Sequence, residues 1–234
     1  MRRDLAGCLV VLAFVLSSGS VFGREPKPSA KTFRLDSLSG LETINIKAEV
    51  AEYRGRRAVR LLKRDDAGAE ANAENESLAI LNGTDFKDGT IEAEVAGMPG
   101  LGAPADARGF IGIAFRVAAH GAKFECFYLR PTNGRAGDQL RRNHSVQYVS
   151  FPDYHWKRLR TENPGMYESY ADLEAGAWTK IKIEVAGTQA RLYVNGAEQP
   201  CLIVNDLKLG DSRGQIALWT TSETDGYFSN LTVK

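Results

Sequence analysis

The stretch T-I-E-A-E-V, residues 90–95, decides the fold class, because apolar and charged side chains alternate along it without a break. Successive side chains of a β-strand point to opposite faces, so Ile91, Ala93 and Val95 would share one face. Residues 181–185 repeat the pattern, with lysine and glutamate between the apolar positions. Both stretches predict strands that have one buried face and one hydrated face.

Similar segments continue along the chain, separated by turn signals. The Asn195-Gly196 pair is a strong hairpin signal, because both residues tolerate positive φ. The acidic stretch 64–76 is expected to be a loop or one short helix. The long connection 152–176 is typical of a functional loop. We expect about a dozen strands and a two-sheet antiparallel β-sandwich. The further strands are expected at 41–52, 57–63, 77–81, 109–117, 123–130, 145–150, 190–194, 201–204, 214–220 and 226–233.

The first residues indicate export. Arg2 and Arg3 precede the apolar run 9–16 and a small-residue exit, which predicts a signal peptide 1–23 cut after Gly23. The apolar run is shorter than the roughly 20 residues of a spanning helix, so we expect no membrane span after its removal. Residues 24–31 would form a flexible leader, and residues 32–234 a single domain in a secreted or extracytoplasmic protein.

Charge and cysteine content narrow the function classes. The net charge is +1, and no basic stripe is interleaved with aromatic residues, which argues against a nucleic-acid partner. Cys126 and Cys201 both lie in apolar strand-like segments, which favours buried free thiols, although export permits a disulfide between them. No cysteine spacing resembles a zinc site.

The ordered motifs resemble the concanavalin A-like lectin/glucanase superfamily in its laminin-G-like jelly-roll form. The motifs are F-x-D-G before the strand at 90–95, G-I-x-F-R at 112–116, W-T-K-I-K-I-E-V at 178–185, V-N-G at 194–196, G-Q-I-A-L-W at 214–219 and F-S-N-L at 228–231. They are similar to bacterial domains described as 3-keto-disaccharide hydrolases. The resemblance implies a carbohydrate ligand, an oligo- or polysaccharide, usually held on the concave sheet or its rim.

The most polar stretch is R-R-N-H-S-V-Q-Y-V-S-F-P-D-Y-H-W, residues 141–156, which concentrates hydrogen-bonding and aromatic groups of the kind that grip polar ligands. Small residues at Gly112 and Ala114 would leave a shallow floor beside the neighbouring strand. We therefore predict a groove with Trp156 as its best stacking residue. Its expected residues are Arg116, Tyr128, Arg130, Asn143, His144 and Gln147, with Tyr154, Trp156 and Arg160 on the rim.

Structural roles explain several of these residues equally well. Arg116 and Arg130 also suit the wet face of a strand, and His144 suits an ordinary loop contact. Trp178 and Trp219 lie in regular strand patterns and are expected in the core.

The sequence gives weaker signals for catalysis than for ligand binding. The E-x-D-x-E motif of glucanases with this fold is absent, and Glu92 and Glu94 suit a hydrated strand face. If the chain is an enzyme, His144 or His155 would be its base, and Arg130, Arg141 or Arg142 would stabilise negative charge. Four turn aspartates have the oxygen ligands that suit a calcium ion, and no other cofactor is indicated. Those aspartates are Asp85, Asp88, Asp206 and Asp225.

Three hypotheses follow. The first is a secreted carbohydrate-binding module that uses the groove. The second is a small secreted glycan-active enzyme, a hydrolase or lyase acting on oligosaccharides. The third is an adhesion-type domain that binds protein, as laminin-G-like domains can. The oligomeric state is left open by the sequence.

Overall fold

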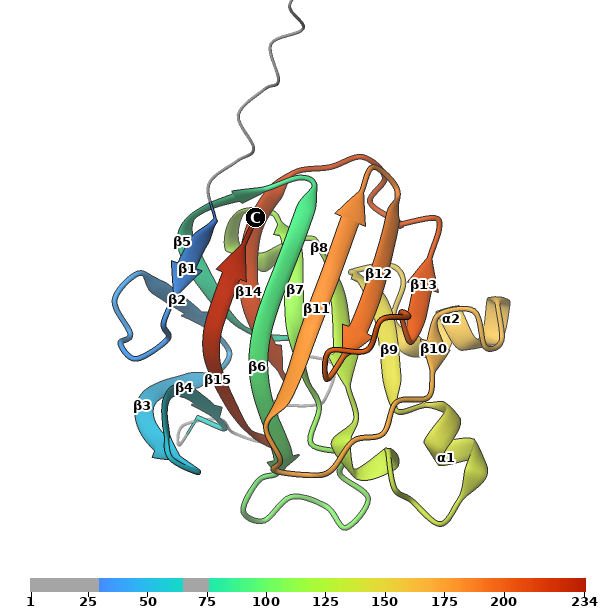
Figure 1. Ribbon diagram of the computed structural model, residues 1–234, viewed down its shortest axis with the longest axis horizontal. Helices are drawn as coiled ribbons and strands as arrows, with labels where there is room; N and C mark the ends of the chain where they lie inside the picture. Colours follow the sequence, from blue (N-terminus) through green and yellow to red (C-terminus); the bar gives the residue numbers. More distant parts are fainter. Residues whose placement is uncertain (1–29, 65–75) are drawn as a thin grey trace, which may run out of the picture.

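Two antiparallel β-sheets lie face to face in the computed structural model, which describes residues 30–64 and 76–234 (Figure 1). The eight-stranded sheet has the order β13 (Leu202–Val204), β12 (Gln189–Val194), β11 (Thr179–Ala186), β6 (Gly89–Pro99), β15 (Thr224–Val233), β4 (Arg56–Leu62), β3 (Lys47–Tyr53), with β1 (Lys31–Phe33) also beside β15. The seven-stranded sheet has the order β10 (Glu168–Ser169), β9 (Val146–Phe151), β8 (Phe124–Leu129), β7 (Ile111–Val117), β14 (Gly214–Thr220), β5 (Ser77–Phe86), β2 (Leu41–Ile44). The predicted all-β, two-sheet antiparallel jelly-roll sandwich is confirmed.

Helical structure is confined to short connections in the described residues. The 3₁₀ turns are η1 (Ala119–Gly121) and η2 (Pro131–Asn133), and the helices are α1 (Gln139–Asn143) and α2 (Trp156–Glu162). Both α-helices lie at the side of the sandwich near β9 and β10 (Figure 1). The expected long connection 152–176 therefore contains α2 and the short strand β10. None of the helices described is long and apolar enough to span a membrane.

The core lies between the inner faces of the two sheets. Ile91, Ala93 and Val95 of β6 are buried there, and Phe115 and Phe127 pack with their ring centroids 6.2 Å apart. Burial of such side chains contributes roughly 25 cal/mol per Å² of apolar surface. The alternation that predicted these strands thus places their apolar side chains in one continuous core.

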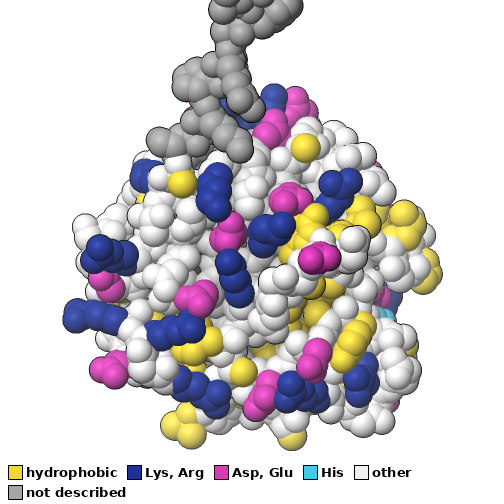
Figure 2. All heavy atoms as spheres, viewed as in Figure 1, with side chains coloured by type: hydrophobic (Ala, Val, Ile, Leu, Met, Phe, Trp, Pro, Cys, Tyr) yellow, Lys and Arg dark blue, Asp and Glu magenta, His cyan; other side chains and the backbone are white. Residues whose placement is uncertain are grey.

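The outer face of the eight-stranded sheet is hydrated and carries paired charges. Figure 2 shows Lys and Arg side chains intermingled with Asp and Glu over this face. Glu92 accepts from Lys180 at 2.9 Å, and Glu94 pairs with Arg56. Glu92 and Glu94 therefore contact cations on a strand surface, as ordinary alternation predicts.

Several boundaries differ from the predicted ones. The single strand expected at 41–52 is two strands, because the backbone turns at Asn45 (φ 55°) and passes from one sheet to the other. The strand β5 continues through Asn82-Gly83, where a turn was expected, by means of a register shift opposite β14. Asn195 and Gly196 do form a turn with positive φ, but a longer loop then leads to β13. Residues 1–29 and 65–75, which include the predicted signal peptide and most of the predicted leader and acidic loop, lie outside the described residues.

Arg116 does not point toward the predicted groove. The residue has φ 53° at a register irregularity between β7 and β14, which interrupts the alternation of side chains. Its buried guanidinium donates to carbonyl oxygens of three separate turns. The acceptors are Lys87 at 2.9 Å, Gly187 at 2.7 Å and Gly210 at 2.7 Å, with Asp88 Oδ1 at 3.2 Å. The structure thus assigns Arg116 to holding loops together at one end of the sandwich.

Replacement of Arg116 by methionine should destabilise the fold by about 3 kcal/mol, because buried carbonyl acceptors lose their donors. Urea denaturation would measure the change. Arg191→Met is the matched control, since Arg191 is exposed on β12, and it should stay within about 0.5 kcal/mol of the wild type. Equal effects of the two substitutions would contradict the role assigned to Arg116.

Candidate functional site

A groove of about 810 Å³ runs over the outer face of the seven-stranded sheet, between the strands and α2. It combines aromatic rings with carboxylate, imidazole, hydroxyl and amine groups. Its lining residues are Glu76, Phe110, Tyr128, Val149, His155, Trp156, Lys157, Arg158, Thr161, Glu162, Trp219 and Thr221. This is the composition and size of a small-molecule or oligomer binding site.

The floor of the groove is aromatic because a glycine separates two large residues. Gly112 on β7 pairs in register with Tyr128 on β8 and with Trp219 on β14. A Cβ atom at Gly112 would lie 2.2 Å from the Phe127 carbonyl oxygen and 2.6 Å from the Tyr128 Cβ, so no side chain fits there. The Tyr128 and Trp219 rings therefore stack across the gap, with centroids 4.6 Å apart. The floor is thus made by these two rings above Gly112, and not by the small residues Gly112 and Ala114 that the sequence suggested.

The wall of the groove is α2, which begins at Trp156. The Trp156 side chain stays 45% exposed, a large exposed fraction for tryptophan, although it lines the groove. The Arg160 guanidinium, one helical turn later, lies 4.8 Å from the Trp156 ring centroid. This cation–π contact orients the ring without covering the whole of it.

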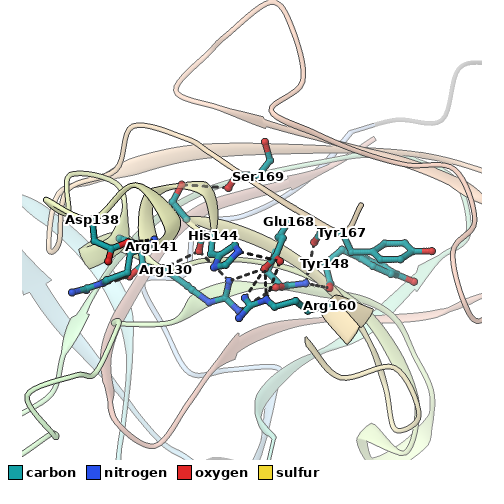
Figure 3. A network of polar contacts seen from close by, with 12 residues as sticks. Arg130, Asp138, Arg141, His144, Tyr148, Arg160, Tyr167, Glu168 and Ser169 are labelled. Atoms are coloured by element: carbon teal, nitrogen blue, oxygen red, sulfur yellow. Dashed lines mark hydrogen bonds and ion pairs between the residues drawn. The ribbon is translucent and has the colours of Figure 1, made fainter. Parts of the chain in front are cut away.

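A buried carboxylate, Glu168 on β10, anchors α2 against the sheet. Arg160 donates to it through Nε at 2.9 Å and through Nη2 at 2.6 Å. Arg130 Nη1 lies 3.8 Å from the same carboxylate, and His144 Nε2 lies 3.3 Å from it. Figure 3 shows the two arginines and the histidine converging on Glu168 from different elements. An unpaired buried charge is costly, so removal of Arg130, Arg160 or His144 would weaken the attachment of α2 to the sheet.

Arg130 and Gln147 belong to the layer beneath the groove. Arg130 donates to the Tyr128 hydroxyl at 2.9 Å and to Gln147 Oε1 at 3.1 Å. Gln147 Nε2 donates to the carbonyl oxygens of Tyr148 and Tyr167. Both side chains are buried with these hydrogen bonds formed. They position Tyr128 and the segment around β10 instead of facing an incoming ligand.

His144 ends α1 as its C-cap residue. Burial lowers the pKa of its imidazole; Glu168 opposes this change, while Arg160 and Arg130 reinforce it. The lowered pKa favours a neutral His144 imidazole near neutral pH, and a neutral imidazole can accept a hydrogen bond.

Glu76 is an acidic group that lines the groove beside Trp219. The Trp219 indole Nε1 donates to Glu76 Oε2, and His155 Nδ1 lies 3.7 Å from Oε1. Burial raises the pKa of this carboxyl to about 7, and the Trp219 hydrogen bond acts in the opposite direction. A carboxyl group that holds its proton near neutral pH can donate a hydrogen bond to a ligand.

The structure brings together most of the predicted site residues and leaves three elsewhere. Tyr128, Arg130, His144, Gln147, Trp156 and Arg160 form the groove and the layer that supports it. Asn143 is exposed on α1, where its Oδ1 accepts from Gln139 at 2.7 Å. Tyr154 lies outside the groove lining beneath Arg158, whose guanidinium is 4.2 Å from its ring centroid. Arg116 lies among the turns described above.

Other groove residues were not anticipated. Trp219 was expected in the core, and it is buried, yet its ring forms part of the floor on the outer face. Phe110 lies in the segment 109–117 expected as a strand, on the same face as Gly112, but it was not selected as a groove residue. Glu76 precedes β5, where strand alternation gives no signal. Trp178 is half-buried on the opposite sheet beside Tyr53, with centroids 5.9 Å apart, and does not lie in the main core.

The predicted calcium ligands are dispersed. Asp85 pairs with Arg213, Asp88 with Arg116, Asp206 with Lys208 and Asp225 with Arg60. No cluster of three or more metal-binding side chains occurs within residues 30–64 and 76–234. Cys126 and Cys201 are both free thiols.

Glu76→Gln should change how stability depends on pH. The raised pKa means that the folded state holds the proton more tightly than the unfolded state, whose pKa is near 4.5. This contribution is complete below about pH 4.5 and is lost as the pH rises through about 7. Relative to the variant, the wild type should lose up to about 3 kcal/mol across that window. Urea denaturation across the pH range would measure it, and parallel profiles would contradict the assignment.

Comparison with known proteins supports the fold. No protein-family model and no curated protein matches the sequence. Among solved structures, the carbohydrate binding module CBM66 from Bacillus subtilis aligns at 15% identity and TM-score 0.55, over 83% of this chain and 96% of that one. A Bacillus subtilis protein of unknown function with a galectin-like fold aligns at 10% identity and TM-score 0.56, over 87% and 94%. A native glycosidic hydrolase aligns at 10% identity and TM-score 0.51, over 88% and 95%. The chain therefore has the concanavalin A-like jelly-roll fold that its motifs suggested.

Proposed function

We propose that this protein binds a carbohydrate in the groove over the seven-stranded sheet. The observation that carries the proposal is the combination of an exposed tryptophan wall, an aromatic floor and several polar groups in one groove of about 810 Å³. Sugars present apolar C–H faces and a ring of hydroxyls, so they need both stacking surfaces and hydrogen-bonding groups.

The residues suggest how a sugar would be held. The exposed Trp156 ring offers a stacking face, and Tyr128 and Trp219 offer a flat floor. His155, Lys157 and Thr161 also line the groove and supply donors and acceptors for hydroxyls. Because the Glu168 network fixes α2, the wall is preorganised and costs little ordering on binding.

The fold comparison is compatible with this proposal. One similar structure is a carbohydrate binding module and another is a glycosidic hydrolase by their own descriptions. A fold hosts many functions, so the argument rests on the groove. We further propose that the protein is exported, in keeping with its N-terminal sequence, so its ligand would be extracytoplasmic.

A glycan-cleaving activity is the second candidate, and Glu76 is the observation that favours it. Its carboxyl group lines the groove, and its raised pKa of about 7 suits a general acid. The initially suggested pair, His144 and Arg130, is less suited, because both engage protein partners beneath the groove. Product release from glycans that is abolished by Glu76→Gln, with binding retained, would favour this candidate.

Trp156→Ala should weaken glycan binding about 5- to 30-fold, because loss of one stacked aromatic face removes roughly 1–2 kcal/mol. Isothermal titration calorimetry with the best ligand from a glycan panel would measure the change. Tyr170→Ala is the matched control, since Tyr170 is an exposed aromatic residue outside the groove lining, and it should bind like the wild type. Unchanged affinity in Trp156→Ala would count against the groove, and a panel without any ligand would favour a protein partner.

A further inference from the structure

Three arginines gather around the short turn η2, next to one end of the groove. Arg130 is its N-cap residue. Arg141 donates from Nε and Nη2 to Asn133 Oδ1, both at 3.3 Å. The Arg108 carbonyl accepts from Thr132 N at 3.4 Å. Arg130 and Asn133 both donate to the His144 carbonyl, so the group forms one connected unit.

Positive charge in this unit exceeds the negative charge that pairs with it. Arg130 shares Glu168 with Arg160 and His144. Arg108 and Arg141 form no ion pair with a carboxylate in the part of the chain that the structure describes. Among residues 30–64 and 76–234, the Arg108 side chain donates to the backbone carbonyl of Asp106 alone, and the Arg141 side chain to the Asn133 amide oxygen alone.

Two carboxylates nearby, Asp106 and Asp138, offset the excess only in part. Asp138 Oδ1 accepts from the backbone N–H of Arg141 as the N-cap of α1. Burial lowers the pKa of the Arg108 guanidinium, and the charges of Arg141 and Arg130 lower it further, while Asp106 opposes them. Arginine remains charged under these conditions, so the like charges repel one another.

The groove leads to these arginines. The Arg130 guanidinium lies 5.6 Å from the Phe110 ring centroid and 5.1 Å from that of Tyr128, and both rings border the groove. Arg108 is two residues before Phe110 in the chain. The groove lining also carries Lys157 and Arg158, Glu162 pairs with Arg158, and the Glu76 carboxyl group holds its proton near neutral pH, so the lining does not repel an anion. The excess positive charge of Arg108 and Arg141 would therefore attract an acidic group of a ligand toward η2.

We propose that the groove selects acidic saccharides, and that Arg108 and Arg141 bind the carboxylate or sulfate group of the sugar. This inference rests on the proposed carbohydrate-binding function and names its ligand class. The planar guanidinium fork matches both kinds of anion, since it can donate two parallel hydrogen bonds to a carboxylate or a sulfate. An anion there would also relieve the repulsion between the arginines.

The test is a glycan array in which every acidic saccharide is printed beside its neutral counterpart, with carboxyl groups reduced or sulfate groups removed. We expect binding to acidic glycans at least about tenfold stronger than to their counterparts. Added salt should weaken this binding. The carboxyl-reduced and desulfated arms show which anion is recognised.

Variants locate the anion site. Arg108→Gln and Arg141→Gln should each remove most of the preference for the acidic ligand and leave binding of its neutral counterpart within about twofold. Arg135→Gln is the matched control, because it removes the same charge from an exposed arginine already paired with Asp172 and Glu174. Arg108→Lys keeps the charge but loses the fork, so it should give an intermediate loss, and circular dichroism would confirm folding.

The outcomes separate the two proposals. Equal binding of acidic and neutral glycans would overturn the acidic preference and leave the carbohydrate-binding function intact. A preference that survives both glutamine substitutions would place the anion elsewhere and overturn the assignment to Arg108 and Arg141. Absence of binding to every glycan would overturn both proposals together.

Discussion

Contact between the inner faces of the two sheets is the constraint on which the other features depend. Once Ile91, Ala93 and Val95 turn inward, the alternating residues must turn outward. On the eight-stranded sheet the outward residues are charged and meet water as ion pairs. On the seven-stranded sheet the outward residues include Tyr128 and Trp219, which are too large and apolar to leave bare. That sheet therefore needs a cover, and the groove lies between the sheet and its cover.

The cover is held by apolar packing and by electrostatics together. Within the segment 152–176, Leu159, Tyr167 and Leu173 are buried in the core. The same segment returns to the sheet through Glu168, whose carboxylate is buried among Arg130, Arg160 and His144. Burial of one carboxylate among several donors is favourable only when the partners are fixed in place. A rigid arrangement of this kind keeps the exposed Trp156 ring at a constant height above the floor, which suits a binding surface.

Charge is distributed unevenly around the groove. The Glu76 carboxyl group beside Trp219 holds its proton near neutral pH, while Arg108 and Arg141 around η2 pair with no carboxylate among the described residues. A neutral ligand would gain little from these cations, whereas a ligand with an acidic group would be held near them. The opposite sheet has no comparable separation, since its cations and carboxylates alternate across neighbouring strands.

Local alternation and composition were enough to predict the β-sandwich, the inward-facing residues of the main strands and the polar stretch 141–156. Tyr128 and Trp156, which the sequence singled out, both line the groove. The supporting positions of Arg130, Gln147 and His144 beneath the groove emerge from the three-dimensional fold alone. The same holds for Arg116, whose positive φ turns its side chain toward distant loops. Only the tertiary structure brought Glu76 to Trp219 and Arg108 to the turn that holds Arg141. The residues of each pair lie far apart in the chain. Sheet order and register bring them into contact, and local alternation carries no information about either.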